Sequence, residues 1–196
     1  MFWPKHNDVA THEDPGWWPS LRGLRWYPIP ILAEVMNVRA WRKETNGLIV
    51  LRSVFLGLLV TLFLFLVPLS FIGPWDGGDE RWVPWAVVVI GIASLAWVAR
   101  IRRRPLPTTS PEALARHYRA LFFIGVCAAA DAALLGFAGV LLGGSSWIYL
   151  VGLAFGLVGL WIIAPTRSDI ERRQREITAA ESPLSLLDAL ISVPRP

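Results

Sequence analysis

The chain alternates long apolar runs with short polar connections. Four runs are almost entirely apolar, at 49–72, 82–99, 119–142 and 147–164. A helix needs about 20 such residues, at a rise of about 1.5 Å each, to cross the hydrocarbon core of a bilayer. The connections within each pair of runs are short, so each pair forms two antiparallel neighbours. The pattern predicts an all-α integral membrane four-helix bundle built from two antiparallel hairpins.

Helix signals extend this pattern on the N-terminal side of two spans. Pro30 suits a first helical turn and predicts a short helix at 30–45, before the first span. Ser110 has the chemistry of an N-cap and Pro111 follows it in the first turn. A helix is therefore expected to begin near 111 and to continue into the third span.

Two further helical segments are predicted after the fourth span. Ser168 and Glu171 have the spacing of a capping box, which would open a polar helix at 168–181. Residues 183–192 carry apolar positions at helical spacing. These positions are Leu184, Leu187 and Ile191. This last segment suits the membrane surface, the base of the bundle or a partner protein. The helix at 30–45 suits the membrane surface or a partner protein.

The chain thus divides into three parts. Residues 1–47 form a cytoplasmic N-terminal segment, with a polar tail followed by a Trp/Arg-rich interfacial region and the short helix. Residues 48–165 form the transmembrane domain. Residues 166–196 form a cytoplasmic helical tail.

One carboxylate, Asp131, lies in the middle of the third apolar run. A carboxylate at mid-bilayer costs about 2.5–3.5 kcal/mol, whereas each large aliphatic or Phe side chain contributes roughly −0.3 to −0.6 kcal/mol. Insertion is therefore favourable overall. We expect Asp131 to face the bundle interior, on a helix face where three of its four neighbours are small. These neighbours are Cys127, Ala128, Leu135 and Ala138.

Asp131 has two alternative roles. It is either a protonated or hydrogen-bonded group that holds helices together, or a site for proton or cation transfer, because ionisable residues inside membranes are candidate functional sites. Thr61 and Ser94 lie near mid-depth in the first and second spans and are its candidate partners. Thr61 has the alternative of bonding to its own preceding turn.

Glycines mark candidate helix-packing surfaces in the last two spans. Gly136, Gly139 and Gly143 form a thin stripe on the third span. Gly152 and Gly156 form a GxxxG pattern on the fourth, followed by Gly159. Such glycines allow close helix packing, either within the hairpin or between copies. The hairpin is favoured because its two helices are already tethered.

Charge sets the expected orientation. The chain has nineteen basic residues and a net charge of +4, and of the basic residues that flank the spans only Arg81 lies on the opposite side. We expect the protein in the plasma membrane. The positive-inside rule then places both termini in the cytoplasm. Only two basic residues are Lys, a bias typical of high-G+C bacterial genomes. The expected ligands are anionic lipid headgroups rather than nucleic acid. The candidate lipid contacts are Arg39, Arg42, Lys43, Arg102, Arg103 and Arg104.

Aromatic residues agree with this orientation. Trp82 and Trp147 begin spans and would mark the outer interface, whereas Trp97 and Trp161 lie near the inner one. Arg52, close to the cytoplasmic end of the first span, is expected to snorkel toward the headgroups.

Sequence patterns that would indicate catalysis are missing. We find no nucleotide-binding loop, zinc-binding helix motif or nucleophile elbow. The chain has a single cysteine, Cys127, so it offers no disulfide framework. No catalytic residue, cofactor or metal is therefore expected. The polar residues of the first fifteen positions are interpreted as a solvated tail.

These observations favour a non-catalytic membrane protein, an accessory or scaffold subunit of a larger membrane complex. The alternative is a small oligomeric transporter or channel-like protein that uses Asp131 as a proton or cation site. The expected partners are the lipid bilayer and either another protein or further copies of the chain.

Overall fold

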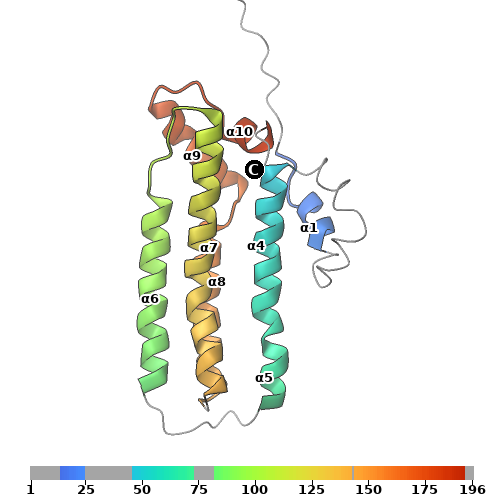
Figure 1. The fold of residues 1–196 in the computed structure, drawn as a ribbon, viewed down its shortest axis with the longest axis vertical. Coiled ribbons are helices and arrows are strands. Elements are labelled where there is room, and N and C mark those ends of the chain that lie inside the picture. The colour runs from blue at the N-terminus through green and yellow to red at the C-terminus, as the bar shows by residue number, and fades with distance from the viewer. Residues whose placement is uncertain (1–13, 25–45, 73–81, 143, 193–196) are drawn as a thin grey trace, which may run out of the picture.

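The computed structural model describes residues 14–24, 46–72, 82–142 and 144–192, and within these ranges it is helical with no strand (Figure 1). The helices are α1 (Trp18–Leu24), α4 (Gly47–Leu64), α5 (Leu66–Ile72), α6 (Trp82–Arg102), α7 (Pro111–Leu141), α8 (Trp147–Ile163), α9 (Arg167–Ala179) and α10 (Leu186–Ser192). The predicted helix at 30–45, with Arg39, Arg42 and Lys43, lies outside the described residues, as does Gly143.

Three helical stretches are long and apolar enough to cross a membrane. They are Gly47–Phe71, which joins α4 and most of α5, then α6, then α7. The fourth candidate, α8, reaches this length only together with α9, from which it is bent by 49°. The chain is therefore a multi-pass membrane protein by length and composition, with three to four candidate spans where four were predicted.

Local sequence explains where these helices begin and end. The hydroxyl of Ser110 accepts a hydrogen bond from the backbone N–H of Ala113, so α7 begins as predicted. Between α4 and α5 the helix is interrupted at Phe65. Pro68 accounts for the break, because its ring lacks an N–H and crowds the carbonyl of Leu64, four residues earlier.

The predicted capping box at Ser168 is wrong. The N-cap of α9 is Thr166, whose hydroxyl accepts a hydrogen bond from the backbone N–H of Asp169. Glu171 instead forms an ion pair with the side chain of Arg167, at 2.8 Å. Thr166 with Asp169 and Ser168 with Glu171 have the same three-residue spacing. The backbone N–H of Thr166 bonds to the carbonyl of Ala164, in a turn at Pro165, and α9 begins directly after it.

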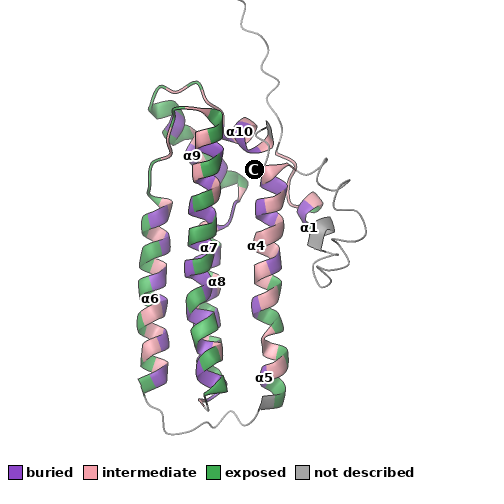
Figure 2. Ribbon diagram, viewed as in Figure 1, coloured by how far each residue is buried: buried purple, intermediate pink, exposed green. Residues whose placement is uncertain are grey.

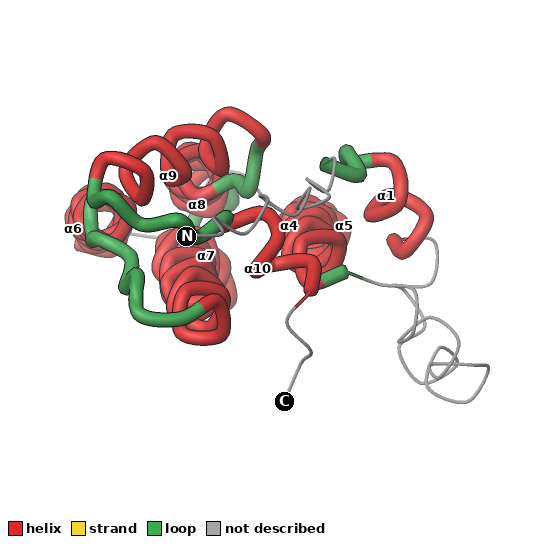
Figure 3. The backbone as a smooth tube through the Cα atoms, turned by 90° about the horizontal axis from the view of Figure 1, so that it is seen from above, coloured by secondary structure: helices red, strands yellow, loops and turns green. Residues whose placement is uncertain are grey.

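The long helices stand side by side (Figures 1 and 3). α6, α7 and α8 pack closely together, and α4 and α5 lie on the side of α7 and α8 opposite to α6. Aromatic residues join these two groups at the end away from α9 and α10. The hydroxyl of Tyr149, on α8, donates a hydrogen bond to the backbone carbonyl of Leu62, on α4. The rings of Phe65 and Phe137 stack with their centroids 4.7 Å apart.

The short helices α9 and α10 gather at one end of the long ones (Figure 1). The buried side chains of α10 are Leu186, Ala189 and Leu190, which pack into the same core as α4 and α7. The predicted stripe of Leu184, Leu187 and Ile191 is only half-buried. The segment 183–192 thus lies at the base of the helices, one of its three predicted placements.

The lateral surface of the long helices is apolar and exposed (Figure 2). Phe71, Trp85 and Trp161 have exposed fractions of 82%, 71% and 85%. A water-facing surface rarely presents so large an apolar area, whereas a lipid-facing one does. This exterior agrees with the membrane class of the chain.

Candidate functional site

Asp131 lies on the exposed face of α7, and the prediction that it faces the interior is wrong for the single chain. It forms no hydrogen bond or ion pair with any residue that the structure describes. Cys127, Leu135 and Ala138 on the same face are exposed too, and only Ala128 of the predicted neighbours is buried. The carboxyl therefore points away from the helices that pack against α7.

The two candidate partners of Asp131 do not reach it. Thr61 is half-buried on α4, and its hydroxyl donates a hydrogen bond to the backbone carbonyl of Gly57 at 2.9 Å. This is the bond to its own preceding turn that the sequence offered as the alternative. Ser94 is buried on α6, with an exposed fraction of 9%.

The small residues of α7 face α8. Gly152 of α8 lies against the backbone carbonyl of Ala132, where a Cβ atom would overlap the oxygen. A Cβ on Gly159 would lie 2.8 Å from that of Ala129. Gly156 packs on the same part of α7, and Gly136 packs on the start of α8. These glycines form the contact within the hairpin.

Gly139 lies between α6 and α8. A Cβ there would be 2.8 Å from a methyl carbon of Val83, on α6, and 3.7 Å from one of Ile148, on α8. Within the predicted glycine stripe of α7, Gly136 therefore packs on α8, whereas Gly139 packs most closely on α6.

Arg52 is fully buried, and the prediction that it snorkels to the headgroups is wrong. Its guanidinium donates two hydrogen bonds to the carboxylate of Asp14, at 2.5 and 2.8 Å. It also donates to the backbone carbonyls of Gly16 and Pro165, at 2.7 and 3.1 Å. The ring of Trp17 lies 5.0 Å from the guanidinium carbon. One side chain thus joins the N-terminal segment, α4 and the corner between α8 and α9.

Asp14 is placed for this role by a turn. The backbone N–H of Gly16, whose φ is +71°, donates to its carboxylate at 2.9 Å. The hydrogen bond from Arg52 holds the pKa of Asp14 below its ordinary value, against the opposing effect of burial. Asp14 therefore belongs to the folded core, and not to the solvated tail to which the sequence assigned it.

A second cluster of charged side chains lies at the C-terminal end of α6. Arg173 of α9 is 4% exposed, and its guanidinium donates to the backbone carbonyls of Arg102 and Arg104. A cation at this position satisfies carbonyls that have no partner within α6 and complements the helix dipole. The carboxylate of Asp169 accepts hydrogen bonds from Arg102 at 3.3 Å and from Arg172 at 2.7 Å. The cluster thus fixes α9 against the end of α6.

This cluster changes the interpretation of the basic run at 102–104. Arg102 was predicted to contact lipid, but its guanidinium pairs with Asp169. Arg103 and Arg104 are exposed and remain free to meet headgroups, with Arg104 above the ring of Trp97 at 5.9 Å.

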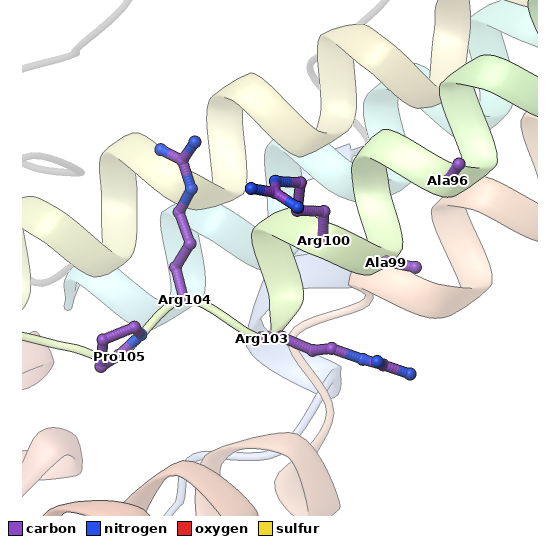
Figure 4. Close-up of a pocket in the computed structure, with 6 residues that line it drawn as sticks. All are labelled: Ala96, Ala99, Arg100, Arg103, Arg104 and Pro105. Atoms are coloured by element: carbon purple, nitrogen blue, oxygen red, sulfur yellow. The ribbon is translucent and has the colours of Figure 1, made fainter.

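An open pocket of about 480 Å³ lies at this end of α6 (Figure 4). Arg100, Arg103 and Arg104 line it together with Ala96, Ala99 and Pro105. Figure 4 shows Arg103 and Arg104 extending in different directions from the end of the helix. A spread of cations around a shallow apolar floor suits anionic groups at a membrane surface.

The tryptophans predicted to mark the interfaces lie on the outside of the helices. Trp82, Trp97, Trp147 and Trp161 have exposed fractions of 64%, 47%, 45% and 85%. Trp82 and Trp147 begin α6 and α8, whereas Trp97 and Trp161 lie toward the opposite ends of the same helices. Their exposure leaves all four rings available to lipid.

The charged clusters around Arg52 and Arg173 could not be found from local sequence. Asp14 lies 38 residues from Arg52, and Pro165 lies 113 residues from it. The sequence did contain one signal, because Arg52 lies in the second turn of a mostly apolar helix. A charged side chain at such a position requires either a short path to water or a buried partner.

These observations define the chain as a helical, multi-pass membrane protein. Arg52 and Asp169 form ion pairs at one end of the long helices, whereas Asp131 forms none with the residues that the structure describes. A comparison with protein-family models, curated proteins and solved structures finds no match. The geometry of the chain itself therefore carries the functional argument.

Proposed function

We propose that this chain is a non-catalytic, four-span protein of the plasma membrane that works as an accessory or scaffold subunit of a larger membrane complex. The observation that carries this proposal is the exposed, unpaired Asp131 on an otherwise apolar face of α7. A polar group in hydrocarbon that finds no partner in its own chain is stabilised by a partner from another.

The proposed orientation has both termini in the cytoplasm, with four helices forming a bundle. Arg100 and Arg102 lie in the last turn of α6, and Arg103 and Arg104 follow it directly. They lie at the same end of the molecule as the arginines of α9. The positive-inside rule assigns this end to the cytoplasm. α8 counts as the fourth span in this proposal, because its apolar surface is exposed like that of the other three.

The position of Asp131 favours assembly over transport through a single chain. A proton or cation site within one chain would lie among its helices, next to groups that could pass the proton on. Asp131 instead faces outward, so any transport path through it would run between subunits.

Gentle purification from the native membrane, followed by native mass spectrometry, tests the proposal. We expect the chain in a stable complex that contains other proteins. A chain that leaves the membrane free of other proteins contradicts the proposal. A thiol reagent that does not cross the membrane tests the orientation, with a cysteine introduced near each terminus. In intact cells a cytoplasmic cysteine is protected from this reagent.

A further inference from the structure

The exposed face of α7 has a regular repeat. Its exposed residues include a series whose spacing alternates between four and three along the helix. The series is Ala120, Ile124, Cys127, Asp131, Leu134, Ala138 and Leu141. A spacing of 3.5 residues keeps one line of side chains facing a partner helix that crosses at a small left-handed angle. We call these seven residues the α7 seam.

The α7 seam runs along a face that the described part of the chain leaves exposed. The buried residues of α7, such as Ala129, Ala132 and Gly136, face the other helices of the chain. Three of the seven seam residues are Ala or Cys, so a helix of similar shape can approach closely. The seam therefore has the geometry of a helix-pairing surface.

Asp131 determines which partner fits the seam. It lies near the centre of the series, with three seam residues on either side. A protonated carboxyl donates one hydrogen bond and accepts others. The basic residues of the described spanning helices lie toward their ends, as Arg52 and Arg119 do, so another copy brings no cation to this depth.

We propose that the α7 seam binds a second copy of this chain, in a parallel two-fold dimer in which the two Asp131 carboxyls hydrogen-bond to each other. A two-fold axis through the seam brings each residue opposite itself. Each protonated carboxyl is then both donor and acceptor for its counterpart, so identical chains complete the pair without any further group. This inference rests on the proposed function, because it names the occupant of the face that makes the chain a subunit.

Self-complementarity is the argument for a second copy over a different protein. A different partner would need a donor or cation at the depth of Asp131 and a matching apolar surface along the whole seam. A second copy in the same membrane orientation brings, by symmetry, a carboxyl donor at this depth and the same apolar surface along the seam. The other long faces of α7 are already occupied by α6 and α8.

The only cysteine of the chain provides the test, because Cys127 is exposed and belongs to the seam, one turn from Asp131. In the dimer the two Cys127 thiols face each other across the axis. Native membranes treated with lipid-soluble copper phenanthroline should contain a disulfide-linked dimer at low expression. The matched control is Cys127→Ala with Ala154→Cys, which moves the thiol to the exposed face of α8. This control should cross-link no more than random collision allows.

Variants of Asp131 then separate hydrogen bonding from simple proximity. Asp131→Asn keeps a donor and an acceptor, so cross-linking should be retained. Asp131→Leu keeps the apolar surface but removes the hydrogen bonds. Its dimer dissociation constant in lipid should rise about threefold to thirtyfold, the range for hydrogen bonds between membrane helices. Absence of a Cys127 cross-link in the wild type, or equal cross-linking of the Ala154→Cys control, overturns the proposal.

The native mass separates this inference from the proposed function. A complex that holds one copy of the chain with other proteins overturns the dimer and leaves the accessory role standing. A dimer without other proteins supports the α7 seam and contradicts the accessory role. A complex with two cross-linkable copies and other proteins supports both.

Discussion

Removal of the Asp14 carboxylate tests whether the N-terminal segment is held by a buried ion pair. In Asp14→Ala, the guanidinium of Arg52 loses two charge-assisted hydrogen bonds, at 2.5 and 2.8 Å. It keeps the carbonyls of Gly16 and Pro165 but stays fully buried with its charge uncompensated. Breaking a buried pair in this way costs about 3–5 kcal/mol.

The loss should appear in two assays. Reversible unfolding in mixed micelles, followed while SDS is raised, should show a free energy of unfolding lower by about 3–5 kcal/mol. The ring of Trp17, which lies over Arg52, should become accessible to a soluble fluorescence quencher when the segment is released. Water that enters the site would solvate Arg52 and reduce the loss of unfolding free energy. Quenching of Trp17 would still report release of the N-terminal segment.

The matched control is the exposed ion pair between Arg167 and Glu171, whose side chains have exposed fractions of 79% and 57%. Glu171→Ala should change the free energy of unfolding by about 0–1 kcal/mol, as surface pairs do. The double variant Asp14→Ala with Arg52→Met should recover stability relative to Asp14→Ala alone, because no buried charge remains. If Asp14→Ala costs no more than Glu171→Ala, the buried-pair reasoning is refuted.

Three further outcomes follow from the same structure. Gly152→Leu should destabilise the hairpin by about 1–3 kcal/mol, because the new side chain overlaps the carbonyl of Ala132; a melting temperature in detergent equal to that of the wild type would contradict this. Tyr149→Phe should cost about 1 kcal/mol of unfolding free energy, because the carbonyl of Leu62 loses the donated hydrogen bond. Since the folded pKa of Asp14 is lowered, its pairing stabilises the fold above the ordinary aspartate pKa, and this contribution is lost as the pH falls through the lowered value. Proteolysis near the N-terminus should therefore increase only in that acidic range, and an onset near neutral pH would contradict the assignment.

Some features of the fold have a cause that lies within a few neighbouring residues. The start of α7 at Pro111 depends on Ser110 and on the proline itself, which are adjacent in the chain. The interruption before α5 depends on Pro68, four residues from the carbonyl that it crowds. In each case the interacting groups lie within one turn, so the sequence contains the whole cause.

The orientation of Asp131 was missed because lipid and helix interior are both apolar. In a soluble helix, hydrophobicity distinguishes the buried face from the exposed one, but in a membrane it does not. The size of the side chains held the better signal. Ala129, Ala132, Ala133 and Gly136 form the narrowest face of α7, and that face packs on α8, which leaves Asp131 outside.

The charged clusters were missed for a different reason. Arg52 with Asp14, and Arg102 with Asp169, are pairs that form only when distant segments meet at the end of the long helices. A sequence shows that a buried arginine needs a partner, but several carboxylates were available. The choice among them depends on how α1 and α9 dock, which is a property of the tertiary structure.

The most direct test of the central claim is the native mass of the assembly released gently from membranes, measured for the wild type and for Asp131→Leu side by side. The chain has a mass of 21.8 kDa. We predict that the wild type is found in an assembly well above this mass, with two copies of the chain and other proteins, and that Asp131→Leu shifts the population toward assemblies with fewer copies. A wild type of 21.8 kDa, free of any partner, or an assembly unchanged by Asp131→Leu, would contradict the role assigned to the exposed face of α7.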